Sequence, residues 1–92
     1  MSFKFFIGID VSKSTLDVGF LDADNSGSVS HQQVSNDDAG IAAVLKWLQK
    51  QNGFSIENSL FCLEHTGMYN YPLLQFFSQQ NASVWVENAG TN

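Results

Sequence analysis

The apolar residues of the chain fall into short runs separated by turn residues, and this pattern predicts a sheet with helices. The run FKFFIGID at residues 3–10 is nearly continuous in apolar character, which is typical of a strand buried in the middle of a sheet. A second run of this kind, SLFCLE, spans residues 59–64. The sequence SVWVE at residues 83–87 predicts a last, shorter strand.

Two further strands are expected between these apolar runs. Residues 15–22, TLDVGFLD, alternate in polarity, and the turn SKS joins them to the first run. Residues 22–28, DADNSGS, are rich in turn-forming side chains, and residues 29–35, VSHQQVS, form a polar strand suited to a sheet edge. Because the connections are short, the first three strands are expected to form an antiparallel meander.

The period changes after residue 35, where the pattern becomes helical. Four apolar residues recur at the spacing of one helix face: Ile41, Val44, Leu45 and Leu48. They predict a helix over residues 37–51, capped by Asn36 or Asp37 and ended at Asn52-Gly53. A second helix is predicted over residues 69–80, with Pro72 in its first turn and Asn81 able to end it.

The order of these elements predicts an α/β fold with a mixed five-stranded sheet. Strands one, four and five are apolar and linked through helices, so they should lie parallel to one another. Strands two and three should pair antiparallel on the other side, giving the order 3-2-1-4-5 with helices packed against the sheet. This is the ribonuclease H-like arrangement.

Composition limits the classes of protein to which the chain can belong. Its 92 residues suit one small domain, and 43% hydrophobic residues suit a folded globule. The net charge is −5 and the only basic residues are four lysines. If the protein binds DNA, the positive charge that contacts the phosphates must therefore lie on further sequence or on a partner. The single cysteine, Cys62, excludes an internal disulfide and is expected to be a small buried hydrophobe. We expect a cytoplasmic protein without a membrane segment, since no signal-peptide pattern or membrane-length apolar run is present.

Two carboxylates stand out because each follows an apolar strand. Asp10 closes the first run and Glu64 closes the run at residues 59–64. In the expected topology these strands are parallel neighbours, and the carboxyl ends of such strands are where open α/β sheets bind ligands. Two acids there would repel each other unless a cation lay between them, and Mg²⁺ (or Mn²⁺) prefers oxygen ligands. Gly8 should point to the same face as Asp10 and leave space beside it.

The remaining polar residues offer few additional ligands. Asp17 and His31 are expected on the strand surface, and His65 is either a polar loop residue or a neighbour that orients Glu64. Glu87 ends the fifth strand and is a weaker candidate for an extra ligand. Both tryptophans, Trp47 and Trp85, are most simply core or core-edge residues. The plain alternative for Asp10 and Glu64 is that they are ordinary strand-end acids facing water.

Four segments resemble the N-terminal domain of the DEDD transposases of the insertion sequence 110 family, which are related to Piv-type DNA invertases. The segments are FIGIDVSKSTLDV, NDDAGIAAVLKWL, LEHTGMYNYPLLQFF and SVWVEN. The resemblance covers residues 5–88, and its most specific parts are G-I-D-V-S-K and E-x-T-G-x-Y.

The resemblance implies a ribonuclease H-like domain, resembling the Holliday-junction resolvase, in which four acids, D-E-D-D, bind divalent metal. Asp10 matches the first acid and Glu64 the second. The third and fourth acids lie, in the family, on a helix after the fifth strand, and this sequence stops at Asn92 before it. We therefore expect residues 1–92 to be the N-terminal part of a single catalytic domain, truncated before its last helix and inactive when isolated. A second domain with a nucleophilic serine is also expected in the family.

The intact protein is expected, from the same resemblance, to be a recombinase that cuts and rejoins DNA. It would act as a homo-oligomer, with a guide RNA from its own mobile element.

Two other classes of function remain open at this point. The first lobe of an actin-like ATPase or sugar kinase also begins with a strand, G-I-D and a phosphate-binding hairpin. Lys13 and Ser14 would then contact phosphate while Asp10 held Mg²⁺. The other class is a non-catalytic remnant of an inserted element.

Overall fold

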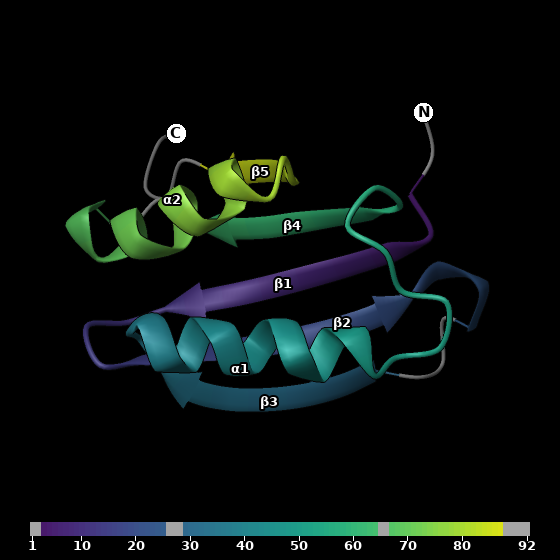
Figure 1. The fold of residues 1–92 in the computed structure, drawn as a ribbon, viewed down its shortest axis with the longest axis horizontal. Coiled ribbons are helices and arrows are strands. Elements are labelled where there is room, and N and C mark those ends of the chain that lie inside the picture. Colours follow the sequence, from purple (N-terminus) through teal and green to yellow (C-terminus); the bar gives the residue numbers. More distant parts are fainter. Residues whose placement is uncertain (1–2, 26–28, 65–66, 88–92) are drawn as a thin grey trace.

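A five-stranded mixed sheet forms the centre of the computed structural model, which describes residues 3–25, 29–64 and 67–87 (Figure 1). In chain order the elements are β1 (Phe5–Val11), β2 (Thr15–Asp22), the 3₁₀ helix η1 (Ala23–Asn25), β3 (Val29–Ser35), α1 (Asp38–Gln49), β4 (Ser59–Glu64), the 3₁₀ helix η2 (Gly67–Asn70), α2 (Tyr71–Gln79) and β5 (Ser83–Glu87). The strand order is β3-β2-β1-β4-β5, with β1, β2 and β3 antiparallel and with β4 and β5 parallel to β1. The predicted ribonuclease H-like arrangement is confirmed.

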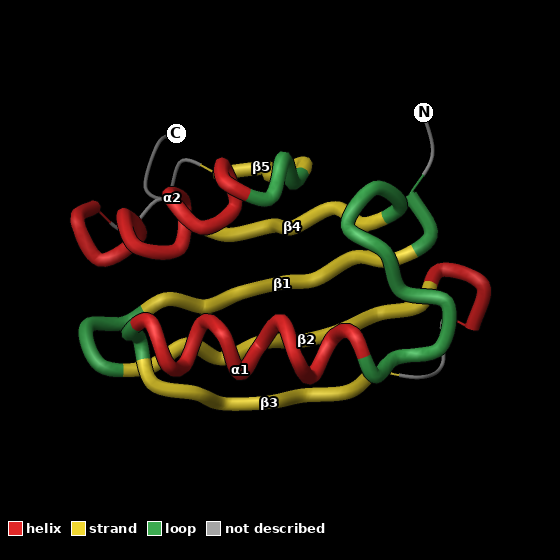
Figure 2. Tube along the Cα trace, viewed as in Figure 1, coloured by secondary structure: helices red, strands yellow, loops and turns green. Residues whose placement is uncertain are grey.

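Both α helices lie on the same face of this sheet (Figure 2). The residues of β1 whose side chains point to this face, Phe5, Ile7, Ile9 and Val11, are at most 7% exposed. They belong to one core with apolar residues of both helices: Ile41, Val44 and Leu48 of α1, and Leu73 and Phe77 of α2. Burying each such side chain contributes about 1.5–3 kcal/mol, so this face supplies most of the driving force for folding.

The first strand is displaced along the sequence from its predicted position. It spans Phe5–Val11, whereas residues 3–10 were expected. Asp10 therefore does not end the strand, because the antiparallel pairing with β2 continues for one more pair, Val11 with Leu16. Val11 is 7% exposed, and the burial of its side chain accounts for the extra residue.

The two helices are shorter than predicted, and their ends follow from local hydrogen bonds. Asp37 caps α1 by accepting a 2.8 Å bond from the Gly40 N–H, as one of the two predicted caps. The Ser35 hydroxyl donates a second 2.8 Å hydrogen bond to the Asp37 carboxylate. Both bonds lower the pKa of Asp37, and the bond from Gly40 has the larger effect. At the other end, α1 stops at Gln49, before the predicted Asn52-Gly53.

The second helix begins at Tyr71, because the residues before it form η2 instead of a regular α turn. Pro72 lies in the first turn, as predicted, where its missing N–H costs no helical hydrogen bond. Asn81 follows the helix with a φ of 55°, the left-handed conformation that asparagine tolerates at a helix end. The expected end of this helix is thus confirmed to within one residue.

Candidate metal centre on the open face of the sheet

The face of the sheet turned away from the helices carries the candidate site. Alternate residues of each strand point to it, and we call it the open face; it includes Gly8, Asp10, Asp17, Cys62, Glu64, Trp85 and Glu87. Within the described part of the chain, no α helix packs on this face (Figures 1 and 2). The even-numbered residues of β1 reach it because successive side chains of a strand point to opposite faces.

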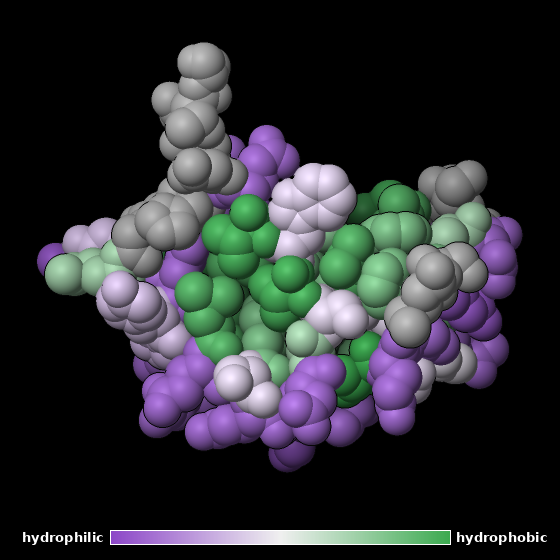
Figure 3. Space-filling model, turned by 90° about the horizontal axis from the view of Figure 1, so that it is seen from above, coloured by the Kyte–Doolittle hydropathy of each residue, from purple (hydrophilic) through white to green (hydrophobic). Residues whose placement is uncertain are grey.

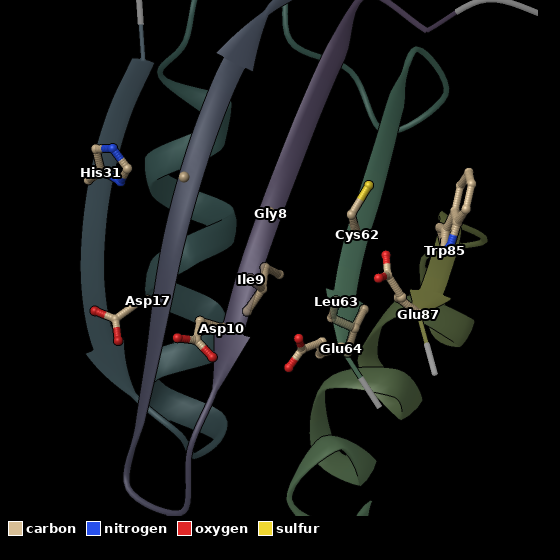
Figure 4. Close-up of a pocket in the computed structure, with 11 residues that line it drawn as sticks. Gly8, Ile9, Asp10, Asp17, His31, Cys62, Leu63, Glu64, Trp85 and Glu87 are labelled. Carbon is tan, nitrogen blue, oxygen red and sulfur yellow. The ribbon is translucent and has the colours of Figure 1, made fainter. Parts of the chain in front are cut away.

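Four carboxylates lie side by side across four strands of the open face, and we call them the acid row: Asp17, Asp10, Glu64 and Glu87. Asp10 is the direct cross-strand partner of Asp17, and Glu64 is the partner of Glu87. The pairing of Ile9 with Leu63 brings the next residues of β1 and β4, Asp10 and Glu64, together at the carboxyl ends of the two strands. In Figure 4 the Glu64 carboxylate extends toward Asp10 at the same end of the sheet. The two acids singled out in the sequence thus lie on neighbouring strands at one end of the open face.

Asp17, at one end of the acid row, has a hydrogen-bond partner on the neighbouring strand β3. Gln33 of β3 donates a 2.8 Å hydrogen bond from its amide nitrogen to an Asp17 carboxylate oxygen. Asp17 was expected on the strand surface, and it is exposed; its backbone is also paired directly with that of Asp10. The sequence does hold a signal for this register: a two-residue turn at Lys13-Ser14 pairs Ser12 with Thr15 and hence Asp10 with Asp17.

A depression of about 800 Å³ extends from the acid row toward the middle of the open face (Figure 4). Two glycines on neighbouring strands, Gly8 and Gly19, form its floor. A Cβ atom built on Gly8 would meet nothing within 4 Å, which bears out the expectation of free space beside Asp10. A Cβ on Gly19 would lie 3.5 Å from the ring of His31, which is exposed as predicted.

Trp85 and Cys62 flank the same depression on β5 and β4. Trp85 was predicted to be a core or core-edge residue, and this is wrong: it is 60% exposed, because no helix packs over it in the described part of the chain. Cys62 is half-buried rather than fully buried, and burial raises the pKa of its thiol. Trp47, by contrast, packs against the core as predicted.

Apolar residues also reach the surface at the β5 edge of the molecule. Figure 3 views the side on which β5 lies and shows hydrophobic residues gathered in its middle, with hydrophilic residues around them. Val86 of β5 is 37% exposed and contributes to this apolar character. His65, the candidate neighbour of Glu64, falls outside the described residues.

The donor set of the central pair suits a hard cation that keeps part of its water. Among residues 3–25, 29–64 and 67–87, no group of three or more His, Cys, Asp or Glu side chains is close enough to hold a metal ion. Mg²⁺ is commonly bound through one or two carboxylates, with waters and substrate phosphates completing its shell. Asp10 and Glu64 therefore fit two positions of such a shell.

The described residues contain no helix that is both long enough and apolar enough to cross a membrane.

Comparison with known proteins points to one family. The family model of the DEDD transposases of the insertion sequence 110 type, described as a transposase, matches residues 7–91. No curated protein sequence matches the chain. Among solved structures, the chain is similar to the crystal structure of the Aquifex aeolicus member of the Ppx/GppA family, at a TM-score of 0.43 and 11% identity. That similarity covers 92% of this chain and 35% of the other, so the chain spans about a third of that protein's length. The family match includes both Asp10 and Glu64.

Proposed function

The chain belongs to the DEDD transposases of the insertion sequence 110 family, and from this we propose that Asp10 and Glu64 are the first two acids of its metal-dependent centre for DNA cleavage and strand transfer. Asp10 occupies the position of the first D in the family's D-E-D-D set, and Glu64 that of the E. The observation that carries the proposal is the parallel register of β1 and β4, which sets both carboxylates at one end of the open face.

The chemistry of phosphoryl transfer explains why two acids belong at this point. Divalent metal, when bound, neutralises the charge that develops on the attacking and leaving oxygens of a phosphodiester. Asp10 and Glu64 hold their oxygens on an exposed surface that a DNA strand can approach, and the space beside Gly8 leaves room for a phosphate. Without a cation the acid row repels DNA, so binding of the strand and binding of metal should be coupled.

The rest of the catalytic apparatus is proposed to lie outside residues 1–92. Two acids provide only part of the ligands that a two-metal centre needs. The family places its third and fourth acids on a helix after the fifth strand. We propose that residues 1–92 form the first part of this catalytic domain and are inactive by themselves. The DNA substrate, a guide RNA and a homo-oligomer are proposed for the intact protein on the strength of the family alone.

The alternative of a kinase-like phosphate loop finds less support in the β1–β2 turn. The Ser12 N–H donates to the Thr15 carbonyl at 2.9 Å, and the Thr15 N–H donates to the Ser12 hydroxyl oxygen at 3.1 Å. Two N–H groups that could have faced a phosphate are thus satisfied within the turn itself. We favour the recombinase, and a non-catalytic remnant is separated from it by the experiment that follows.

The test is strand cleavage by the full-length protein with Asp10→Asn or Glu64→Gln. Each substitution keeps the shape of the side chain and removes a metal ligand, so cleavage should fall by at least about a hundredfold. The matched control is Asp38→Asn, which removes an exposed carboxylate in the first turn of α1, away from the open face. Cleavage by Asp10→Asn at the level of the Asp38→Asn control would contradict the proposal. A wild-type protein without cleavage activity would instead favour the remnant.

A further inference from the structure

The backbone pairing between the two acid-bearing strands stops just before the acids. The last paired residues of β1 and β4 are Ile9 and Leu63. Beyond them Asp10 is paired only outward, to β2, and Glu64 only outward, to β5. The sheet ladder therefore fixes each acid from its outer side but leaves the spacing between the two acids to other contacts.

A buried asparagine holds the Glu64 side of this gap. Asn70, the last residue of η2, is 1% exposed, and its side-chain nitrogen donates a 3.0 Å hydrogen bond to the Glu64 carbonyl. Asparagine is rarely so buried unless its polar atoms are engaged. The bond fixes the backbone of Glu64 at the point where β4 ends.

A second asparagine holds the Asp10 side and connects it to the first. The Asn36 side-chain nitrogen donates to the Ser12 carbonyl at 2.8 Å and to the Tyr69 carbonyl at 3.2 Å. Ser12 lies two residues after Asp10, and Tyr69 immediately precedes Asn70. A continuous path of hydrogen bonds and backbone thus runs from the end of β1 through Asn36 and Asn70 to Glu64.

The cost of keeping Asn36 in this place argues for a role beyond filling space. Its side-chain oxygen is buried and has no hydrogen-bond partner among the described residues. A buried acceptor without a partner costs free energy, and native proteins keep such groups where another requirement outweighs that cost. Both partners of the Asn36 nitrogen are carbonyl oxygens, so turning the amide over would lose both bonds and set the side-chain oxygen against two other oxygens.

We propose that Asn36 and Asn70 are positioning residues that set the separation of the Asp10 and Glu64 carboxylates for a shared divalent cation. We call this pair the asparagine brace; the inference rests on the proposed function, since it needs a cation at Asp10 and Glu64. The brace does not touch the cation. It acts as a second layer of contacts that orients the ligands, and removing such contacts typically weakens metal binding by about 10–100-fold.

The chain offers a matched control at the opposite end of the sheet. Asn58, half-buried just before β4, donates from its side-chain nitrogen to the Gly53 carbonyl at 3.4 Å. Like the brace it joins a loop to an end of β4, but it lies at the end that does not carry Glu64. Asn58→Ala therefore reports the cost of losing an asparagine tether without disturbing the acids.

The experiment is a Mn²⁺ titration of the 92-residue chain, followed by paramagnetic broadening of the Val11 and Leu63 amide signals. Asp10→Asn identifies the site, since this variant should lack the broadening that Mn²⁺ causes in the wild-type chain. Asn36→Ala and Asn70→Ala should each weaken Mn²⁺ binding by about tenfold or more, while Asn58→Ala stays within about twofold of wild type. A urea melt of each variant confirms folding, and Asn36→Ala decides the matter if Asn70→Ala does not fold.

The outcomes separate the two proposals. Brace variants that bind Mn²⁺ as well as Asn58→Ala does, at a site that Asp10→Asn abolishes, would overturn the brace and leave the metal centre standing. A wild-type chain whose broadening is insensitive to Asp10→Asn would overturn the metal centre, and the brace with it.

Discussion

The two faces of the sheet obey different rules. On the covered face, alternate residues of β1 are buried to 7% exposure or less beneath α1 and α2. On the open face, the residues between them are Phe6, Gly8 and Asp10, and the neighbouring strands add further acids and an exposed tryptophan. The same strands thus carry the fold on one side and the candidate chemistry on the other. Stability and function should therefore respond to different substitutions in one element.

The largest expected effect is the loss of an aromatic side chain from the covered face. Phe61 is 1% exposed and its ring centroid lies 4.5 Å from that of Phe77. Phe61→Ala should lower the free energy of unfolding by about 3–5 kcal/mol, through lost burial and the cavity left behind. Urea denaturation measures this. Trp85→Ala on the open face is the control, and a loss as large as that of Phe61→Ala would break the distinction between the faces.

Two glycine-to-alanine substitutions, each of which adds one methyl group, test the same comparison more finely. A Cβ on Gly40, in α1, would run into the Ser35 carbonyl, so Gly40→Ala should destabilise by about 1–3 kcal/mol despite the better helix propensity of alanine. A Cβ on Gly8 meets nothing, so Gly8→Ala should stabilise by about 0.5–1 kcal/mol. Urea melts of both variants check the signs. Destabilisation by Gly8→Ala would show that something in the chain already occupies the space beside Asp10.

A smaller effect is expected at the start of α1, and it depends on pH. Hydrogen bonds from Gly40 and Ser35 hold the pKa of Asp37 below its ordinary value of 3.8. A carboxyl with a lowered pKa adds stability above its unfolded-state pKa and loses it as the pH falls through the lower folded-state value. Asp37→Ala should therefore reduce stability at pH 7, and the difference from wild type should shrink below pH 4. Urea midpoints measured across this range check it; a difference that grows on acidification would contradict the assigned cap.

The sequence predicted the covered face better than the open one, for a physical reason. Strands and helices that pack against each other need apolar residues at regular spacings. The strand order and both helices could therefore be inferred from the sequence. The exposure of Trp85 could not, because an aromatic residue in a strand looks the same whether or not a helix covers it. The hydrogen bond from Asn70 to the Glu64 carbonyl, on which the proposed brace depends, could not be inferred either, because no local sequence pattern predicts it.

The pairing of Asp10 with Asp17 is an intermediate case. It follows from a two-residue turn, yet the sequence SKS allows more than one turn length. The first strand was also misplaced at its end, since the register extends one pair past Asp10.

The central claim is that Asp10 and Glu64 share a cation, and Mg²⁺-dependent urea melts test it most directly. At a Mg²⁺ concentration about ten times a millimolar dissociation constant, the wild-type chain should gain about 1.4 kcal/mol of stability. Asp10→Asn and Glu64→Gln should lose this gain and, without Mg²⁺, be as stable as wild type or slightly more so, since like-charge repulsion is relieved. The control Asp38→Asn should keep the gain. An equal Mg²⁺ response in all four chains, or an Asp10→Asn chain that is destabilised without Mg²⁺, would contradict the shared site.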